Sequence, residues 1–530
     1  MTTLSEHHPG GIVSAGDIQT ARAGAIALER GGNAIDAAVA ASLAAFVCEV
    51  ALCGPVGGGV MVAKLADGTQ HAVDFFGRTP GLGLRSRPEL DFGEATIDFG
   101  VASQSFKVGR GAAAIGLALP GLLEIHHRWG QIPLSEVAEP AIILGRQGFV
   151  VGAPMAYILR LISAIFSWTP ESKALCYVGD RLPTDGDRLF NHGLASVLET
   201  VARQPSEVRG VYAQFAREFG PSRGGLITSA DLDRMAVDFH QPIETTMNGW
   251  SFATMPPPST GGCLIGLGLR LLEGIGERCE AFSEDYYRTM VDVQRRLLEV
   301  RTHDFDTQIR EGDYLNRLLS KEFVDELSQR TLVDAALEPS HPLGSTTQIS
   351  AMDDAGGVVA LTLTNGEGCG CVLSGTGIQV NNLLGEADIN PRGFHVDPPG
   401  LAMSTMMAPS VVHRGADRFA LGSGGSNRLR NAIMMTVTNL IEFGLSPRTS
   451  VDSGRVHLER AEHGFELNFE GAEHSAALRS SLASLYDRHT EFPGRNMFFG
   501  GVHSVFNLNG TLSGIGDPRR GGHVARPGQG

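Results

Sequence analysis

Three threonines near residue 350 have a type and spacing that could support nucleophilic chemistry. TTQISAMD (346–353) and VVALTLT (358–364) alternate along the chain with a turn-forming DDAGG between them, which predicts a β-hairpin. A turn centred on Ala355 places Thr346 opposite Thr364, and the two-residue period of a strand puts Thr362 on the same face as Thr364. Three hydroxyls at one end of a hairpin are candidates for acyl-transfer catalysis.

The same pattern also has a purely structural interpretation. Threonine is common in strands, and cross-strand threonine pairs stabilise sheets. A register shifted by one residue would separate the three hydroxyls. The spacing alone therefore leaves both interpretations open.

Other segments offer little competing chemistry. GSGG (422–425) could be a turn, a weak phosphate loop or a set of backbone donors, whereas Gly57–Gly59 favours tight packing. The adjacent histidines at 7–8 and 126–127 do not have the spacing of ligands on one helical face, and no HExxH, GxSxG or Walker motif occurs.

The seven cysteines are scattered without a CxxC pair, which favours free thiols packed as small apolar groups. Cys369 and Cys371 flank Gly370 and could be a regulatory pair, although residues that line a loop are the simpler interpretation. We expect neither a metal nor an organic cofactor.

Neighbouring elements must hold the hairpin, and several are readable in the sequence. Ala, Ile and Leu at helical spacing predict a helix over 18–30 that ends at Gly31. Asn33 can cap a second helix, which is apolar all round and therefore buried. The further predicted elements are strands at 60–65 and 71–76, helices over 112–165 with breaks at Pro120-Gly121 and Gly148, and a helix opened by 255–262.

Composition narrows the class of protein. The 530 residues are 42% apolar and 19% charged, which is globular rather than disordered or fibrous. A net charge of −15 disfavours nucleic acid and anionic membranes as partners. The first residues lack the features of a signal peptide, and no apolar run approaches the ~18 residues of a membrane helix. We therefore expect a soluble, cytoplasmic protein.

The chain resembles the γ-glutamyltranspeptidase family of N-terminal-nucleophile hydrolases over nearly its whole length, and the order and spacing of the matches are specific. The matching segments are GGNAIDAAVAA (31–41), GPVGGGVMV (54–62), LPGLLEI (119–125), PLSEVAEPAI (133–142), GGLIT (224–228), MPPPSTGG (255–262), 345–368, GTGIQVNN (375–382) and GSGGSNR (422–428). The resemblance implies an α+β fold, a four-layer αββα sandwich of two antiparallel sheets between helical layers.

The resemblance also implies self-processing. In that family the precursor cuts itself just before a threonine, which by position is the Ser345–Thr346 bond. The Thr346 hydroxyl would attack the Ser345 carbonyl carbon, and water would cleave the resulting ester. The freed α-amine, with an ordinary pKa of about 7.7–8.0, could then serve as base for the same residue's hydroxyl. Residues 1–345 and 346–530 would form a large and a small chain, partners in one intertwined domain.

Supporting roles follow from the same resemblance. Thr364 matches the threonine that holds the nucleophile, and Thr362 matches a second supporting threonine. Gly424 and Gly425 match the pair whose backbone amides form the oxyanion hole. Asp353 matches an acidic position that we interpret as structural.

The residues that would hold a substrate carboxylate depart from the family pattern. The arginine of the family's D-F-R motif is replaced by Phe76, and Arg78, two residues further on, is the candidate substitute. The family's Ser-Ser-Met reads Thr-Met-Met, which leaves Thr405 as a candidate substrate contact.

The residues that would hold a substrate ammonium depart as well. Leu383 replaces the family's glutamine, while Glu386 keeps an acid near the same place. The family's asparagine is Gly366 here, with Asn365 beside it as a candidate contact.

We therefore expect a self-processing enzyme that cleaves or transfers an acyl group at an amide bond of a small molecule. Glutathione and γ-glutamyl peptides are the substrates that the resemblance implies. The apolar Phe76 and Leu383 favour a small non-glutamyl amide instead, because a pocket loses discrimination when its polar contacts go. The alternative is a non-catalytic relative that stays uncut and acts as a binding or scaffold protein.

Overall fold

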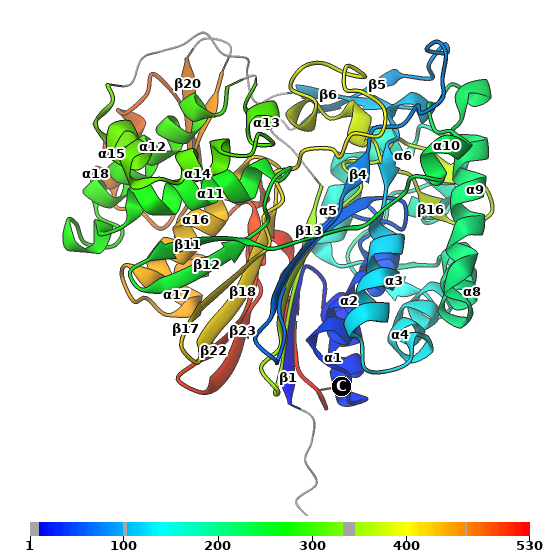
Figure 1. Cartoon of the computed structure of the whole chain (residues 1–530), viewed down its shortest axis with the longest axis horizontal. Helices are drawn as coiled ribbons and strands as arrows, with labels where there is room; N and C mark the ends of the chain where they lie inside the picture. Colours follow the sequence, from blue (N-terminus) through cyan, green and yellow to red (C-terminus); the bar gives the residue numbers. More distant parts are fainter. Residues whose placement is uncertain (1–9, 99–102, 303, 332–344, 462–463, 530) are drawn as a thin grey trace, which may run out of the picture.

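Two sheets packed face to face form the centre of the molecule (Figure 1). This computed structural model describes residues 10–98, 103–302, 304–331, 345–461 and 464–529. The seven-stranded sheet has the order β10 (Asp238–His240), β3 (Gln70–Phe75), β2 (Gly58–Lys64), β14 (Val358–Thr364), β13 (Thr347–Asp353), β1 (Gly11–Ala15) and β24 (His523–Ala525). The six-stranded sheet has the order β11 (Ile243–Met247), β12 (Trp250–Thr254), β17 (Ser410–Arg414), β18 (Asp417–Gly424), β22 (Gly501–Leu508) and β23 (Thr511–Ile515).

Helices cover the outer face of each sheet. On the right of Figure 1, the seven-stranded sheet is covered by α1 (Ile18–Glu29), α2 (Ala34–Cys48), α3 (Ala118–Trp129), α4 (Leu134–Gln147) and α8 (His192–Arg203). On the left, the six-stranded sheet is covered by α11 (Thr260–Leu272), α12 (Glu284–Val300) and α16 (Arg428–Ile441). Every strand pair in both sheets is antiparallel. The expected αββα sandwich is confirmed.

Shorter elements lie around these layers. Among them are β4 (Gly77–Arg78), β5 (Gly93–Asp98), β6 (Ser103–Val108), β7 (Ile115–Gly116), α5 (Ala153–Leu161), α7 (Pro170–Cys176), α9 (Val208–Glu218), α10 (Ser229–Leu232), α15 (Lys321–Gln329), α17 (Pro447–Asp452), β19 (Val456–Arg460), β20 (Phe465–Glu470), α18 (Ala476–Ala483) and β21 (Arg488–Phe492). Within the described residues, no helix is both long and apolar enough to cross a membrane.

The helix α2 shows why the sequence folds as it does here. The Asn33 side chain accepts hydrogen bonds from the amides of Ile35 and Asp36, and the Asp36 carboxylate accepts one from the Asn33 backbone N–H. This capping box satisfies donors that a helix start leaves free. Every residue of α2 is buried, as its uniformly apolar sequence predicts.

The central hairpin has the predicted register. Ser350 pairs with Ala360, and Gln348 pairs with Thr362. Ile349 and Leu361 pack into the core beneath α1 and α2, whereas Val358 and Ala360 belong to the core on the other side. Strand alternation therefore turns Thr362 and Thr364 toward the space between the sheets and turns Thr347 toward the helices.

One predicted helix break is wrong. The helix α3 runs through Pro120 and Gly121. N–H groups in the first turn of a helix have no intrahelical acceptor, so a proline there removes no helical hydrogen bond. Gly121 fits there because its bare Cα lies against the Phe75 ring, where a Cβ would collide. The break at Gly148 is confirmed, since α4 ends at Gln147.

The segments before and after residue 345 share both sheets. In the seven-stranded sheet, β14 and β13 of the later segment lie between β2 and β1 of the earlier one. In the six-stranded sheet, β12 of the earlier segment pairs with β17 of the later. Neither of the two central sheets is built from one segment alone.

Candidate active site

The hydroxyl of Thr364 is the centre of the predicted site. It donates to the Ser345 carbonyl oxygen at 2.5 Å and accepts from the Gly366 amide at 2.9 Å. The Thr346 hydroxyl donates to it at 3.5 Å. Thr346 and Thr364 are each 6% exposed, so these contacts form largely out of water. The hairpin thus joins the predicted nucleophile, its predicted partner and the predicted cleavage bond.

Thr362 lies two residues before Thr364 in β14. Its hydroxyl donates to the Gln348 side-chain oxygen at 2.6 Å, and Gln348 in turn donates to the Ile349 carbonyl and the Ser350 hydroxyl. Thr362 therefore orders the strand that carries Thr346 and makes its hydrogen bond to Gln348 rather than to the nucleophile.

The two predicted oxyanion glycines lie where the end of β18 meets Thr346. A Cβ on Gly424 would collide with the Thr346 carbonyl oxygen. Gly425 has a φ of +120°, which residues with side chains rarely adopt. Glycine at 424 therefore lets the backbone approach the start of the hairpin closely, and glycine at 425 permits the turn that follows.

The earlier glycine run serves packing, as predicted. A Cβ on Gly57 would lie 2.5 Å from the Thr364 carbonyl oxygen and would collide with the Asn365 side chain. Gly58 packs against Phe76 and Gly59 against Phe75, and neither glycine has room for a Cβ.

Three acidic residues gather beside Thr364. Glu386 reaches the Gly366 backbone so closely that a Cβ there would overlap its carboxylate. Glu367 follows directly in sequence, and Asp388 accepts a hydrogen bond from the Ser426 hydroxyl. Glu367 is 1% exposed, and the Ser345 amide and the Asn382 side chain lie near its carboxylate. No hydrogen bond of normal geometry reaches either of its oxygens, or Glu386 Oε1, in the described chain.

Burial dominates the electrostatics of these acids. It raises the pKa of Glu367 to about 8, with the charge of Asp388 adding to the shift and the nearby Ser345 amide opposing it. Burial also raises the pKa of Glu386 well above its usual range, and Glu367 and Asp388 add to that shift. Since carboxylates this close repel one another, a cation placed among them would favour their charged forms.

Two predicted substrate contacts, Arg78 and Asn365, already have partners within the fold, and both stay predictions. The Arg78 guanidinium forms an ion pair with Asp238 and also donates to the carbonyls of Gly77 and Ala236. The Asn365 amide donates to the Gln379 carbonyl at 3.3 Å and packs against Gly57. The Arg78 guanidinium is therefore engaged inside the fold, whereas Asn365 Oδ1 has no hydrogen-bond partner among the described residues.

Thr405 is also held by local contacts. Its hydroxyl accepts from the Met407 amide at 3.1 Å, and its carbonyl accepts from the Thr260 amide at 2.9 Å. The hydroxyl keeps its own proton to donate, so Thr405 stays a predicted contact.

Sequence reasoning missed Glu367 and Asp388. Glu367 lies three residues beyond Thr364 on a chain that turns back through Gly366, whose φ is +64°. The Gly-Glu pair just past a predicted catalytic strand was the available signal. No comparable signal marked Asp388, because the fold of 383–390 brings it to the site.

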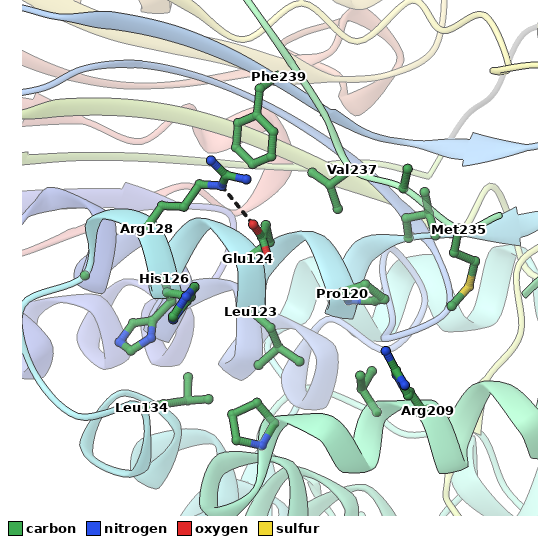
Figure 2. Close-up of a pocket in the computed structure, with 16 residues that line it drawn as sticks. Pro120, Leu123, Glu124, His126, Arg128, Leu134, Arg209, Met235, Val237 and Phe239 are labelled. Atoms are coloured by element: carbon green, nitrogen blue, oxygen red, sulfur yellow. Dashed lines mark hydrogen bonds and ion pairs between the residues drawn. The ribbon is translucent and has the colours of Figure 1, made fainter. Parts of the chain in front are cut away.

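A larger cavity, about 870 Å³, lies away from these residues (Figure 2). It opens between α3, α9 and the segment Met235–Phe239. Arg128 at its edge pairs with Glu124 at 2.8 Å and lies over the Phe239 ring. None of the predicted site residues lines it, so size alone does not locate the chemistry.

Comparisons with known proteins agree with this fold and site. A family model described as gamma-glutamyltranspeptidase matches residues 20–526. The acylase ACY 1 proenzyme of Pseudomonas sp. (strain V22) is 30% identical over 509 residues, covering 93% of this chain and 89% of its own. The glutathione hydrolase proenzyme of Escherichia coli (strain K12) is 27% identical over 512 residues, covering 89% and 87%.

The cephalosporin acylase from Bacillus halodurans has the same fold, with a TM-score of 0.81 at 22% identity over 98% of this chain and 96% of that one. The sandwich, with a threonine entering its central strand, defines an N-terminal-nucleophile hydrolase. The chain belongs to the gamma-glutamyltranspeptidase family and is an enzyme of that family's hydrolase and acyltransferase type.

Proposed function

We propose that this chain cuts its own Ser345–Thr346 bond and then uses Thr346 to cleave or transfer an acyl group at a small amide. One observation supports this most strongly: a single hydroxyl, that of Thr364, contacts both the Ser345 carbonyl and the Thr346 hydroxyl. A structural threonine pair would not need the second contact.

The self-cleavage follows from these contacts. Thr364 donates to the Ser345 carbonyl oxygen, so it stabilises the negative charge that forms when the Thr346 oxygen adds to that carbon. The hydroxyl proton passes to the Thr346 nitrogen, the C–N bond breaks, and an ester remains. Water then splits the ester into a Ser345 carboxylate and a free Thr346 hydroxyl.

Turnover would repeat this chemistry on a substrate. The Thr346 α-amine takes the hydroxyl proton as the oxygen attacks the substrate carbonyl. The backbone amides of Gly424 and Gly425 would donate to the tetrahedral oxygen, a role supported by the packing of Gly424 against Thr346. The leaving amine takes the proton, and water or another amine then receives the acyl group from Thr346.

The acidic cluster supports a particular acyl group. Among the described residues, Glu367 and Glu386 present buried carboxylate oxygens that accept no hydrogen bond, which suits an ammonium on the acyl chain. At the positions that would hold a carboxylate in the family, Phe76 replaces the arginine and Arg78 is paired with Asp238. The relatives are named as an acylase and as a glutathione hydrolase. We infer a donor amide whose acyl group carries an amino group and needs no carboxylate.

Two measurements test this proposal. On a denaturing gel, the wild type should give two bands and Thr346→Ala one uncut, inactive chain. On the processed enzyme, three p-nitroanilide donors test which charged group of the acyl chain is recognised. The 4-aminobutyryl donor has only an ammonium, the γ-glutamyl donor has an ammonium and a carboxylate, and the glutaryl donor has only a carboxylate. We expect kcat/KM to fall in that order. Cleavage in Thr346→Ala would refute the nucleophile, and fastest turnover of the glutaryl donor would refute the ammonium site.

A further inference from the structure

The cavity of about 870 Å³ shown in Figure 2 lies on the helix-covered face of the seven-stranded sheet. Its walls come from α3, from α9 and the 3₁₀ turn η2 (Pro205–Glu207) before it, and from residues 235–239. Leu119 and Leu122 fix α3 on the core beneath the helices, whereas Thr364 points toward the space between the sheets. The cavity and the candidate active site therefore lie on opposite sides of the sheet.

Most of the side chains that line the cavity are apolar. They include Pro120 and Leu123 of α3, Val208 of α9, and Met235 and Val237. Apart from Pro120, each of these packs on the core with one part and leaves another part unburied. The volume lies within the range of about 300–1,000 Å³ that small-molecule sites occupy. Such walls suit the apolar body of an organic ligand, because binding removes their exposed surface from water.

One positive charge in the cavity has no partner. Arg209 projects from α9 into the cavity, and its guanidinium points away from the helix (Figure 2). This side chain forms neither an ion pair nor a hydrogen bond with any residue that the structure describes. Its donors are therefore open to a ligand.

The other ionised groups of the cavity are already paired with each other. Arg128 pairs with Glu124 at 2.8 Å and lies over the Phe239 ring. Glu124 is the only acid among the described residues that line the cavity. Arg209 thus leaves the cavity with an uncompensated positive charge, although the chain as a whole has a net charge of −15.

An unpaired guanidinium beside apolar walls suits an organic anion. The planar guanidinium of arginine can form two parallel hydrogen bonds to a carboxylate, and its single charge balances one carboxylate rather than a phosphate dianion. Proline and methionine side chains pack well on flat rings. We propose that this cavity binds an aromatic carboxylate, with its ring against Leu123, Met235 and Val237 and its carboxylate on Arg209.

Calorimetric titration of the wild-type protein with 2-naphthoate tests the binding. Naphthalene-2-carboxamide keeps the ring without the charge, 2-naphthylmethylamine reverses the charge, and acetate has the carboxylate without the ring. 2-Naphthoate should bind about fivefold more tightly than the carboxamide, since a charge pair open to water contributes little more than this. The amine should bind more weakly than the carboxamide, and acetate should not bind measurably.

Two variants of Arg209 test where the ligand binds. Arg209→Gln should raise the Kd of 2-naphthoate about fivefold, as loss of the same charge pair predicts, and Arg209→Glu should raise it further by repulsion. Arg217→Gln, an exposed change on the same helix outside the cavity, should leave the Kd unchanged. Arg209 is itself exposed, so all three variants should melt at the wild-type temperature.

Further measurements separate this binding from the proposed catalysis, on which it does not depend. The Thr346→Ala chain should bind 2-naphthoate as tightly as the wild type, and 2-naphthoate should not raise KM for the 4-aminobutyryl donor. Absent binding, an unchanged Kd in both Arg209 variants, or a carboxamide as tight as 2-naphthoate would overturn the proposal. So would a raised KM, which means binding at the catalytic site, or a dimer that Arg209→Glu separates, which means that a second copy covers the cavity.

Discussion

Thr364 has one partner before the proposed cleavage that it lacks afterwards. In the uncut chain its hydroxyl donates to the Ser345 carbonyl oxygen, and cleavage turns that carbonyl into a carboxylate at a chain end. The same hydroxyl is then available to the Thr346 hydroxyl, at present 3.5 Å away. One residue can thus support self-processing first and turnover second.

Replacing Thr364 by valine should therefore slow self-processing about 10²- to 10³-fold, the usual cost of losing an oxyanion donor. Band intensities on a denaturing gel over time measure the rate. Thr364→Ser keeps the hydroxyl and should process within about tenfold of the wild type. Thr362→Val is the matched control, since its hydroxyl bonds Gln348. Equal slowing in both valine variants would contradict a direct role for Thr364.

The raised pKa of Glu367 predicts a pH dependence of substrate binding. Its pKa of about 8 means that the acid is mostly neutral at pH 7 and charged above 8. An ammonium binds the charged form, so KM for the 4-aminobutyryl donor should fall as pH rises from 6 to 9. Glu367→Gln should have a higher and flatter KM over this range, and an unchanged profile would contradict an ammonium contact at Glu367.

Arg78 leads to the opposite expectation from that of the motif comparison. Because its guanidinium is paired with Asp238, Arg78→Ala should change KM for γ-glutamyl-p-nitroanilide by less than about twofold. A partly exposed pair of this kind contributes about 0–1 kcal/mol to stability, so the melting temperature should fall slightly, as in Asp238→Ala. A tenfold rise in KM for Arg78→Ala would restore Arg78 as a substrate contact.

At the scale of elements, the glycines at the start of β2 determine how close this strand comes to Thr364. Gly57 passes so near Thr364 that no side chain fits between the two strands. The pairing of β14 with β13 in turn determines where Thr346 lies relative to Thr364. The catalytic geometry therefore depends on the packing of three adjacent strands.

Gly57→Ala should strain that packing. Its Cβ would lie 2.5 Å from the Thr364 carbonyl oxygen, and overpacking of this kind typically costs about 1–3 kcal/mol. We expect a lower melting temperature together with slower processing. Gly312→Ala is the control, because nothing lies within 4 Å of its Cβ position. A Gly57→Ala enzyme as stable and as fast as the wild type would show that the strands can separate freely.

At the scale of the whole molecule, the two segments cannot form separate domains. Strands from before and after residue 345 alternate in the seven-stranded sheet. Cutting the Ser345–Thr346 bond would leave this pairing in place.

The processed chains should therefore stay together without a covalent bond. Gel filtration of the cut protein should give one peak at the size of the uncut Thr346→Ala chain, with both bands on a denaturing gel of that peak. In a urea titration both chains should unfold in one transition, because each central sheet contains strands from both. Separation of the chains in buffer alone would contradict an intertwined fold.

The sequence by itself predicted the hairpin and the buried helix α2, because strand alternation, turn residues and caps are local signals. It offered the observed register but left a shift by one residue open, and the structure decided between them. It also predicted that Thr346 and Thr364 would meet, since a hairpin pairs residues close in the chain. The family resemblance extended this to the sandwich and to the glycines at 424–425, which lie far from the hairpin in sequence.

Only the tertiary structure decided which charges are free. Arg78 meets Asp238, 160 residues later, whereas among the described residues Arg520 forms no ion pair of the kind that joins its neighbour Arg519 to Glu470. The C-terminal segment that holds Arg520 contains β24 of the central sheet. A charged side chain has the same residue type whether paired or not, and its partner is set by contacts between distant segments that no local pattern records.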